Sequence, residues 1–578
     1  AMDGGLVIWA TDRYGEKNHG SWGGETDVVG AFLDQETYDR FTMTKEERQL
    51  AEGRKPAKPE KNGDDSEAES EDDDEKEAEP VEIDWGGIED RTVRLTIHSS
   101  DLGGFAMTPD GRALVYLAEF EDGHDLWIHD FVEESTKLEV KLGANRASMQ
   151  MTPDGKAVFV LADGKIQKIG LKTGDEGTRT GEKDMVSFDP EMNVRPDAER
   201  AYLFEHVWRQ VQQKFYDPEL HGVDWEFYRE QYEPKLAGIR HNRDFAEVLS
   251  EILGELNASH TGGRYFGGPD DPERTASLGV YYDRDHDGDG MRIAEILPRG
   301  PLAEAELGIE PGMVITAVDG VELTDEINFH RLLNNKAGER VRLRFEPPSG
   351  DDFERVVEPI GRGAESRMRY DRWVQQRRAQ VEELSDGRIG YVHVQGMNDR
   401  SFRVAYAEVM GRNFDKEAIV VDTRFNGGGW LHDDLVVLLG GEAYVDFMPR
   451  NQAVPGQRFH GEPGKRWWKP SAVVMNEANY SDAHFFPWVY DHLDIGPTIG
   501  MPVAGTATAV WWERLHTGDL VFGIPQVGIV ELGTTNYLEN QQLQPDHRVA
   551  ITPEQHATGE DPQIVEAVRV LLEELGAE

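Results

Sequence analysis

The sequence contains no cysteine. This absence excludes disulfide bonds and a cysteine nucleophile, so neither can be used to infer a redox compartment. Long apolar runs are also missing: no stretch approaches the roughly 20 residues that a membrane-spanning helix requires. The first residues lack the basic-then-apolar pattern of a secretory signal. We therefore expect a chain without a membrane span.

Basic residues are scarce. The chain has 61 Lys and Arg against 110 Asp and Glu, a formal net charge of -49. This balance argues against nucleic acid as a partner, because the phosphates would not be neutralised. It favours cationic partners instead. Part of the acidic excess lies in residues 60–84, and we predict a disordered insertion over about residues 50–84, since such a run cannot bury apolar surface.

The length of 578 residues exceeds what one hydrophobic core can hold, so several domains are expected. Two segments near the start repeat: "MTPDGRALVYLA" begins at Met107 and "MTPDGKAVFVLA" at Met151, 44 residues apart. A Pro-Asp-Gly turn followed by an alternating strand at this period is typical of a β-propeller blade. Three or so blades do not close a ring. We predict a partial β-propeller over residues 1–189, with an open β-meander as the alternative.

From Asp197 the apolar spacing becomes helical, in "AERAYLFEHVWRQVQQKFYD" and "RDFAEVLSEILGELNASH". This predicts a small helical domain over residues 190–268, with Ser259 and His260 at a helix end. The following short strands and the segment "PGMVITAVDG" resemble a PDZ domain over residues 269–362. PDZ domains bind a chain terminus by adding a strand to their sheet, and "SLGVYY" stands where the carboxylate-binding loop is expected.

An acidic segment inside this domain imitates a calcium loop. "DRDHDGDG", residues 283–290, has acids at alternate positions and a glycine at the sixth. The twelfth position is Ala294, where a calcium loop has a bidentate glutamate. We interpret the segment as a tight acidic hairpin turn, with calcium binding as the lesser alternative.

The last domain, residues 363–578, alternates strands with helices, which predicts a mainly parallel sheet covered by helices. Sites in such sheets gather at the carboxyl ends of strands. One strand, "EAIVVDTR", leads into the glycines 427–429. The Gly-Lys-Ser/Thr ending of a phosphate loop is absent, so an oxyanion hole is the better interpretation of these glycines.

A second strand ends at "NEANYSD", where Ser481 opens a predicted helix. The positive end of that helix and the backbone N–H of Asp482 would lie near an oxyanion. Ser-Asp before a helix is also a common N-cap. A nucleophilic serine needs a base, and a lysine that follows it is excluded because the last lysine is Lys469. This domain offers several histidines as candidate bases, none of them in an evident motif: His432, His484, His492, His516, His547 and His556.

At this point the whole pattern resembles a known family. "LGELNASHTGG", the PDZ-like segment, "VVDTRFNGGG", "NEANYSDAHFFP" and "NYLENQQLQPD" are similar to the tricorn proteases, self-compartmentalising relatives of carboxy-terminal processing proteases. The resemblance implies a multidomain α+β chain: partial β-propeller, helical domain, PDZ domain and a crotonase/ClpP-like α/β catalytic domain. It also implies a serine endopeptidase acting on oligopeptides without metal or cofactor.

The resemblance assigns roles to particular residues. Ser481 would be the nucleophile and His260 the general base, with Ser259 between the imidazole and Glu539. The oxyanion hole would use the N–H of Asp482 and that of Gly428 or Gly427. An exposed loop acid is the alternative for Glu539, since Glu531 is close by. An acid after the glycine loop selects basic P1 residues in this family, and Asp446 is the candidate here, with a surface acid on an edge strand as the alternative.

Partners and location follow from the same resemblance. It implies a homo-oligomer, a hexamer in the family, and a cytoplasmic location, with the periplasm left open if a secretory signal has been removed. The rival hypothesis is a catalytically silent scaffold whose PDZ and propeller surfaces bind peptides. The combined presence of Ser481, His260, Ser259, Glu539 and the glycines favours the enzyme.

Overall fold

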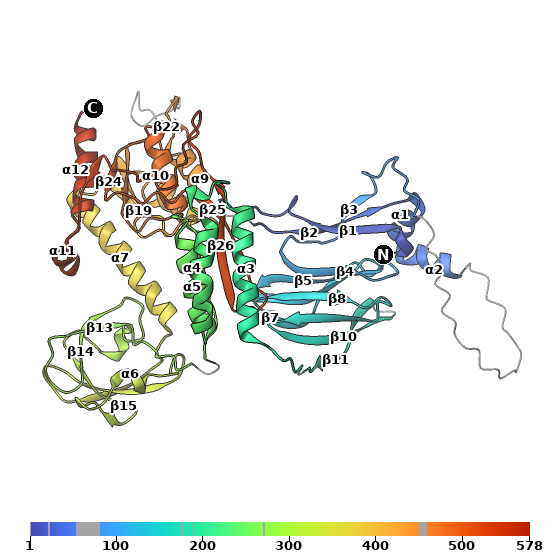
Figure 1. Cartoon of the computed structure of the whole chain (residues 1–578), viewed down its shortest axis with the longest axis horizontal. Coiled ribbons are helices and arrows are strands. Elements are labelled where there is room, and N and C mark those ends of the chain that lie inside the picture. The colour runs from blue at the N-terminus through green and yellow to red at the C-terminus, as the bar shows by residue number, and fades with distance from the viewer. Residues whose placement is uncertain are drawn as a thin grey trace, which may run out of the picture. The chain divides into compact units, whose positions relative to one another are not determined.

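The computed structural model describes residues 2–20, 23–53, 81–174, 177–188, 190–269, 272–448, 450 and 459–577 (Figure 1). The chain forms two compact units, Ala1–Asn18 with Trp22–Asn193 and His19–Ser21 with Val194–Glu578. Among the described helices, none is long and apolar enough to cross a membrane.

The described residues of the first unit form three antiparallel sheets. Two helices, α1 (Gln35–Thr42) and α2 (Lys45–Gly53), follow its second strand. The strands of the three sheets, in chain order, are β1 (Leu6–Thr11), β2 (Asp27–Phe32) and β3 (Thr92–Arg94); β4 (Asp101–Met107), β5 (Ala113–Glu121), β6 (Gly123–Asp130) and β7 (Ser135–Ala144); β8 (Ala147–Met151), β9 (Ala157–Ala162), β10 (Lys165–Gly174) and β11 (Gly177–Val186).

The two repeats found in the sequence fold in the same way. In each copy a threonine hydroxyl donates to the aspartate two residues later over 2.6 Å, at Thr108 and at Thr152. The glycine that follows has a positive φ, 71° at Gly111 and 66° at Gly155, a conformation that glycine adopts without strain. Each repeat therefore supplies one turn and one central strand to a four-stranded sheet, and the propeller assignment stays a prediction.

The predicted acidic insertion falls mostly outside the described residues, which omit 54–80. Its first residues, 50–53, belong to α2 and are helical.

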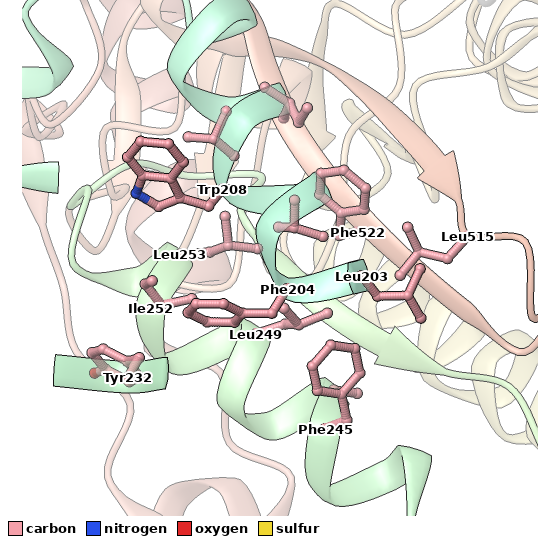
Figure 2. Close-up of a cluster of buried hydrophobic side chains, with 14 of the residues drawn as sticks. Leu203, Phe204, Trp208, Tyr232, Phe245, Leu249, Ile252, Leu253, Leu515 and Phe522 are labelled. Carbon is pink, nitrogen blue, oxygen red and sulfur yellow. The ribbon is translucent and has the colours of Figure 1, made fainter. Parts of the chain in front are cut away.

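In the second unit, a helical module begins with α3 (Pro196–Lys214), α4 (Trp225–Tyr232) and α5 (Asn242–Gly254) and continues into β12 (Gly262–Tyr265). Strand β12 pairs with β26 (Leu520–Gly528), and β26 pairs with β25 (Thr508–Arg514). Figure 2 shows the core of this module, where side chains of α3 and α5 pack against Leu515 and Phe522 from the distant hairpin. Burial of these apolar side chains binds residues 508–528 to a module that lies about 250 residues earlier in the chain.

The PDZ-like segment forms an antiparallel sheet in the order β13-β14-β15-β17-β18, with β16 paired to β15. Residues 283–290 connect β13 to its antiparallel partner β14, so the predicted hairpin is confirmed. The elements of this module are β13 (Val280–Tyr282), β14 (Met291–Ile296), β15 (Val314–Val318), β16 (Val321–Glu322), α6 (Phe329–Leu332), β17 (Val341–Glu346) and β18 (Phe353–Val357).

A five-stranded sheet forms the centre of the last module, and all four of its strand pairs are parallel, as predicted. Its strands, in spatial order, are β19 (Ile389–His393), β20 (Ala418–Asp422), β23 (Ser471–Met475), β24 (Thr498–Gly500) and β27 (His547–Arg548). A separate two-stranded ribbon consists of β21 (Val445–Phe447) and β22 (Phe459–Glu462).

Helices cover both faces of this sheet, and alternate side chains of each strand serve one face or the other. Ile419 and Val421 of β20 belong to the cluster with α8 (Asp399–Ala407), α9 (His432–Leu439) and α10 (Asp482–His492). Ala418 and Val420 belong to the opposite cluster, with α7 (Arg362–Leu384) and α12 (Pro562–Ala577). A short helix, α11 (Pro553–Thr558), precedes α12.

Candidate active site

Ser481 lies between the end of β23 and the start of α10. Its backbone has φ 58° and ψ -126°, a conformation that costs a non-glycine residue of order 1–3 kcal/mol. Its N–H donates to the hydroxyl of Thr506 over 2.7 Å. Ser481 stands at the N-cap position of α10, yet its side chain makes no capping hydrogen bond. The simple N-cap interpretation therefore does not account for this serine.

The glycine loop packs directly against Ser481. A Cβ at Gly428 would lie 2.5 Å from the Ser481 Cβ and 2.6 Å from the carbonyl oxygen of Tyr480. A Cβ at Gly429 would lie 1.9 Å from the carbonyl oxygen of Met397. Both glycines have positive φ, 96° and 141°. Only residues without a side chain allow this approach of two loops.

Backbone N–H groups of the glycine loop and of the start of α10 differ in whether they are hydrogen-bonded. The N–H of Gly428 donates to Asn426 Oδ1 over 2.9 Å. Within the described part of the chain, the N–H groups of Gly427 and Asp482 make no hydrogen bond. Asp482 is in the first turn of α10, where helix N–H groups lack an intrahelical acceptor and carry the positive end of the helix dipole.

The Asp482 carboxylate joins the two loops. It is 4% exposed and accepts from the N–H of Leu431 over 2.5 Å and from that of His432 over 3.0 Å. The His432 ring nitrogen Nδ1 lies 2.6 Å from its other oxygen. The Asp482 side chain thus caps the N-terminus of α9, the helix after the glycine loop. Asp482 is itself the first residue of α10. His432 is held by this contact.

Ser259 and His260 were predicted at a helix end, but α5 ends earlier, at Gly254, and the two residues lie in a turn between α5 and β12. The turn is fixed by β26. A Cβ at Gly523 would lie 2.3 Å from the His260 carbonyl oxygen, so glycine is required there. Pairing of β12 with β26 thereby brings His260 to residues of the last module.

A hydrogen-bonded chain links Glu539 to His260 through Ser259. Glu539 Oε2 accepts from the Ser259 hydroxyl over 3.0 Å and from the Ala507 N–H over 2.7 Å. Its other oxygen accepts from the Ser259 N–H over 2.5 Å. Ser259 Oγ lies 2.8 Å from His260 Nδ1. Glu539 is 5% exposed, so it is not the exposed loop acid that the sequence left open.

The hydrogen bonds from Glu539 through Ser259 fix the tautomer of His260. An ionised carboxylate only accepts hydrogen bonds, so the Ser259 hydroxyl hydrogen points to Glu539. Ser259 Oγ then has only lone pairs to offer His260, and its 2.8 Å approach places the ring hydrogen on Nδ1. The opposite nitrogen, Nε2, keeps its lone pair. A neutral imidazole in this tautomer is a base at Nε2.

Burial sets the charge states of both ends of this chain. His260 is 8% exposed, and burial, helped by the nearby Arg264 charge, lowers its pKa to about 4. Burial also raises the pKa of Glu539, although the hydrogen bonds from Ser259 and Ala507 oppose this effect. At neutral pH the imidazole is therefore uncharged and able to accept a proton.

Tyr480 connects His260 to the loop that carries Ser481. Its phenol oxygen accepts from the His260 N–H over 2.6 Å, and the two ring centroids are 4.8 Å apart. Its own N–H donates to the Asn426 carbonyl at the glycine loop over 3.0 Å. Ser481 is the next residue. No hydrogen bond joins Ser481 Oγ to His260 Nε2 in the described residues, and both groups are left without a partner there.

His484 lies on α10, one helical turn after Ser481, and its side chain is fully buried. It is 0% exposed, and burial lowers its pKa to about 4. Its Nδ1 accepts from the Thr506 N–H over 3.3 Å. Asp446 lies on β21 in register with His460. The other candidate bases lie elsewhere: His516 beside Glu199, His547 beside Glu566, and His492 stacked on Trp488.

Three consecutive residues contribute contacts that sequence reasoning missed. Thr506 holds the Ser481 N–H, Ala507 donates to Glu539, and Thr508 Oγ1 lies 2.9 Å from His260 Nδ1. Their small polar and apolar side chains form no motif, so no signal in the sequence marks them. Tyr480 did stand in the quoted "NEANYSD" segment, but an aromatic residue before the serine carries no sign of its partner.

Side chains spaced to hold a metal ion occur in one group within the described ranges: Asp101, Glu119 and His124, in the first unit. Ser481, His260 and Glu539 are not part of such a group.

Comparison with protein families matches three segments of the chain. Residues 196–254 match the tricorn protease C1 domain, residues 277–361 the tricorn protease PDZ domain, and residues 388–549 peptidase family S41. Tricorn protease homolog 1 of Streptomyces coelicolor is 30% identical over 454 residues, 75% of this chain and 41% of that protein.

The chain belongs to the tricorn protease family. Tricorn protease of Thermoplasma acidophilum is 26% identical over 453 residues, 76% of this chain and 40% of that protein. The tricorn-family chain thus spans about two fifths of the length of these relatives. The crystal structure of the tricorn protease superposes with a TM-score of 0.73 at 19% identity, covering 99% of this chain and 54% of that one. This likeness shows a shared fold.

Proposed function

We propose that this chain is a serine peptidase that hydrolyses oligopeptides, with Ser481 as nucleophile and His260 as general base. Ser259 and Glu539 hold the imidazole in its Nδ1–H tautomer. Peptidase family S41 and the tricorn relatives support the reaction class. The observation that carries the proposal is the continuous hydrogen-bonded chain from Glu539 through Ser259 to His260 Nδ1, which leaves Nε2 as a free base. The His260 backbone N–H is bonded to Tyr480, the residue before Ser481.

The reaction follows from these groups. Ser481 Oγ attacks the scissile carbonyl carbon as its hydrogen passes to His260 Nε2. The Nε2 hydrogen then passes to the leaving amine as the C–N bond breaks, and water hydrolyses the acyl-enzyme by the same base. Hydrogen bonds at a catalytic base are often looser in substrate-free structures and form in the substrate complex. This accounts for the unbonded Ser481 hydroxyl.

The oxyanion of the tetrahedral intermediate would accept from the Asp482 N–H and from a glycine N–H. Gly427 suits this role, since its N–H is not engaged, whereas the Gly428 N–H is bonded to Asn426. Gly428 would need to release Asn426 first. Loss of one such donor typically lowers kcat by about 10²- to 10³-fold.

A fluorophosphonate probe tests the proposal. Such probes react with a serine that a base activates, so we expect labelling of Ser481 in the wild-type chain, none in Ser481→Ala, and strongly slowed labelling in His260→Ala. Ser471→Ala is the control, since Ser471 is a buried serine of β23 whose hydroxyl is hydrogen-bonded to Tyr490. A folded wild-type chain that the probe leaves unlabelled would instead support the peptide-binding scaffold.

Two finer assignments are proposals as well. Asp446 is proposed to select basic P1 side chains, and the assembly is proposed to be a homo-oligomer, a hexamer in the family that this chain resembles. Cleavage of a peptide library by the wild type and by Asp446→Ala tests the first: an unchanged P1 preference rejects it. Sedimentation velocity gives the oligomeric state directly.

A further inference from the structure

We infer that Thr508 is a second positioning residue for the catalytic base, sharing the Nδ1 hydrogen of His260 with Ser259. This inference rests on the proposed function and deepens it. Thr508 Oγ1 lies 2.9 Å from His260 Nδ1 and 3.2 Å from Ser259 Oγ. Thr508 is 5% exposed, so water does not compete freely for these contacts.

The hydrogens of the three groups can be assigned without conflict. Ser259 donates to Glu539, so the hydrogen between Ser259 and His260 is on Nδ1. Because Nδ1 carries a hydrogen, Thr508 Oγ1 must also accept from it. The Thr508 hydroxyl hydrogen is then free to point to Ser259 Oγ, which accepts with a second lone pair. The Nδ1 hydrogen therefore has two acceptors, which lie at 2.8 and 2.9 Å.

The backbone fixes Thr508 in this place. It is the first residue of β25 and pairs with Gly528 of β26. Strand β26 also pairs with β12, the strand that directly follows the Ser259–His260 turn. The two residues before Thr508 also contact the site. Thr506 accepts from the Ser481 N–H, and the Ala507 N–H donates to Glu539. Thr508 is thus attached to the same sheet that carries the base and to the same loop that holds the nucleophile and the acid.

With two acceptors on Nδ1–H, the orientation of the His260 ring does not depend on either acceptor alone. With Ser259 removed, Thr508 still accepts from Nδ1, and with Thr508 removed, Ser259 still does. With both removed, the Nδ1 hydrogen has no acceptor and the ring can rotate or adopt the other tautomer, which presents N–H instead of a lone pair to Ser481. The loss from the double substitution should therefore exceed the product of the two single losses.

The first experiment measures kcat and KM for peptide cleavage in Thr508→Val, Ser259→Ala and the double variant. We expect Thr508→Val to lower kcat by about threefold to tenfold with little change in KM, the size of one lost hydrogen bond. The double variant should fall by at least about tenfold more than the product of the single effects. A double variant that matches the product, or that is no slower than Ser259→Ala, would overturn the inference.

Matched substitutions separate the hydroxyl from the methyl group of Thr508. Thr508→Ser and Thr508→Ala both lose the methyl, but only the serine keeps the acceptor, so Thr508→Ser should retain near wild-type kcat and Thr508→Ala should not. Thr517→Val is the control on the same hairpin, because the buried Thr517 hydroxyl has no partner within the described residues. Equal kcat values for Thr508→Val and Thr517→Val would also reject the inference.

A spectroscopic readout keeps this test independent of peptidase activity. In protein labelled with [15N]histidine, the hydrogen-bonded Nδ1–H of His260 should give a low-field proton signal that His260→Gln removes. We expect the signal to persist in each single variant and to disappear in the Ser259→Ala/Thr508→Val double variant. If the chain proves inactive but the signal behaves in this way, the proposed function fails while the shared hydrogen stands; a signal that Ser259→Ala alone abolishes contradicts the sharing.

Discussion

The backbone N–H of His260 donates to the phenol oxygen of Tyr480 over 2.6 Å. The two residues lie 220 positions apart, and each stands beside another residue of the site: His260 follows Ser259, and Tyr480 precedes Ser481. This contact directly joins the turn that carries His260, the proposed base, to the loop that carries Ser481, the proposed nucleophile.

Tyr480→Phe should therefore loosen the base without removing it. The aromatic ring would still pack on His260, but the His260 N–H would lose its acceptor, and an unsatisfied backbone donor costs about 1–3 kcal/mol when buried. We expect kcat for peptide cleavage to fall by about tenfold. Tyr202→Phe is the control, because Tyr202 is 63% exposed and its hydroxyl is not bonded in the described residues. Equal kcat values for these two variants would reject the role of the contact.

Glu539→Gln should lower activity more than it lowers stability. The Glu539 carboxylate accepts all three of its hydrogen bonds, two from Ser259 and one from Ala507. A glutamine places an NH₂ group against one of them and leaves the orienting chain incomplete, so we expect kcat to fall by about 10²- to 10⁴-fold. Steady-state kinetics measure this, with Glu531→Gln as the nearby control. A change below threefold would contradict the assignment.

Gly428→Ala should disrupt the approach of the two loops. The added Cβ would meet the Ser481 Cβ at 2.5 Å, and the positive φ of 96° disfavours any side chain. We expect a lower thermal midpoint and a fall in fluorophosphonate labelling of at least about 10²-fold. Gly363→Ala is the matched control, since a Cβ there meets no atom within 4 Å. Normal labelling of the Gly428 variant would show that the loops separate easily.

Stability should fall as the pH is lowered from neutral, because two buried imidazoles must stay uncharged. The pKa values of His260 and His484 are lowered to about 4, whereas histidine in an unfolded chain titrates near about 6.5. The unfolded state therefore binds protons first, and the contribution to stability, complete above about pH 6.5, is lost progressively as the pH falls to about 4.

His484→Asn isolates one of these groups outside the proposed chemistry. Its amide oxygen can replace Nδ1 as acceptor for the Thr506 N–H. We expect the midpoint of urea unfolding to depend less steeply on pH between about 6.5 and 4 than in the wild type, since one protonation step is removed. Parallel pH profiles for the two proteins would mean that His484 is charged or exposed.

Much of the last module could be predicted because its signals are local. The apolar runs of β19, β20 and β23 are buried on both faces, and the parallel order follows from their alternation with helices. Glycine at 428 and serine at 481 could be placed at strand ends for the same reason. The position of Ser259 and His260 was less accurate: the helical spacing continued to Leu256, but α5 ended at Gly254 and the two residues lie in the turn beyond it.

Other features carried no local signal. His484 has helical spacing from Ser481 that suits an exposed face, yet Thr506 from a later loop covers it. Glu539 and Glu531 are equivalent in sequence, and burial against Ser259 and Ala507 distinguishes Glu539. Thr508 could not be found at all, because a threonine at a strand start is ordinary and its partners lie 248 and 249 residues earlier.

The amino-acid order by itself determined the elements: which segments form strands and helices, where glycines permit sharp turns, and which chemical groups the chain contains. Those properties depend on neighbours a few residues apart. The tertiary structure alone decided that the Ser259–His260 turn meets the loop of Tyr480, because the pairing of β12 with β26 and the burial of the hairpin in the helical core join segments separated by more than 200 residues. Burial then decided the charge states, since the low dielectric that keeps His260 neutral exists only after those segments have packed.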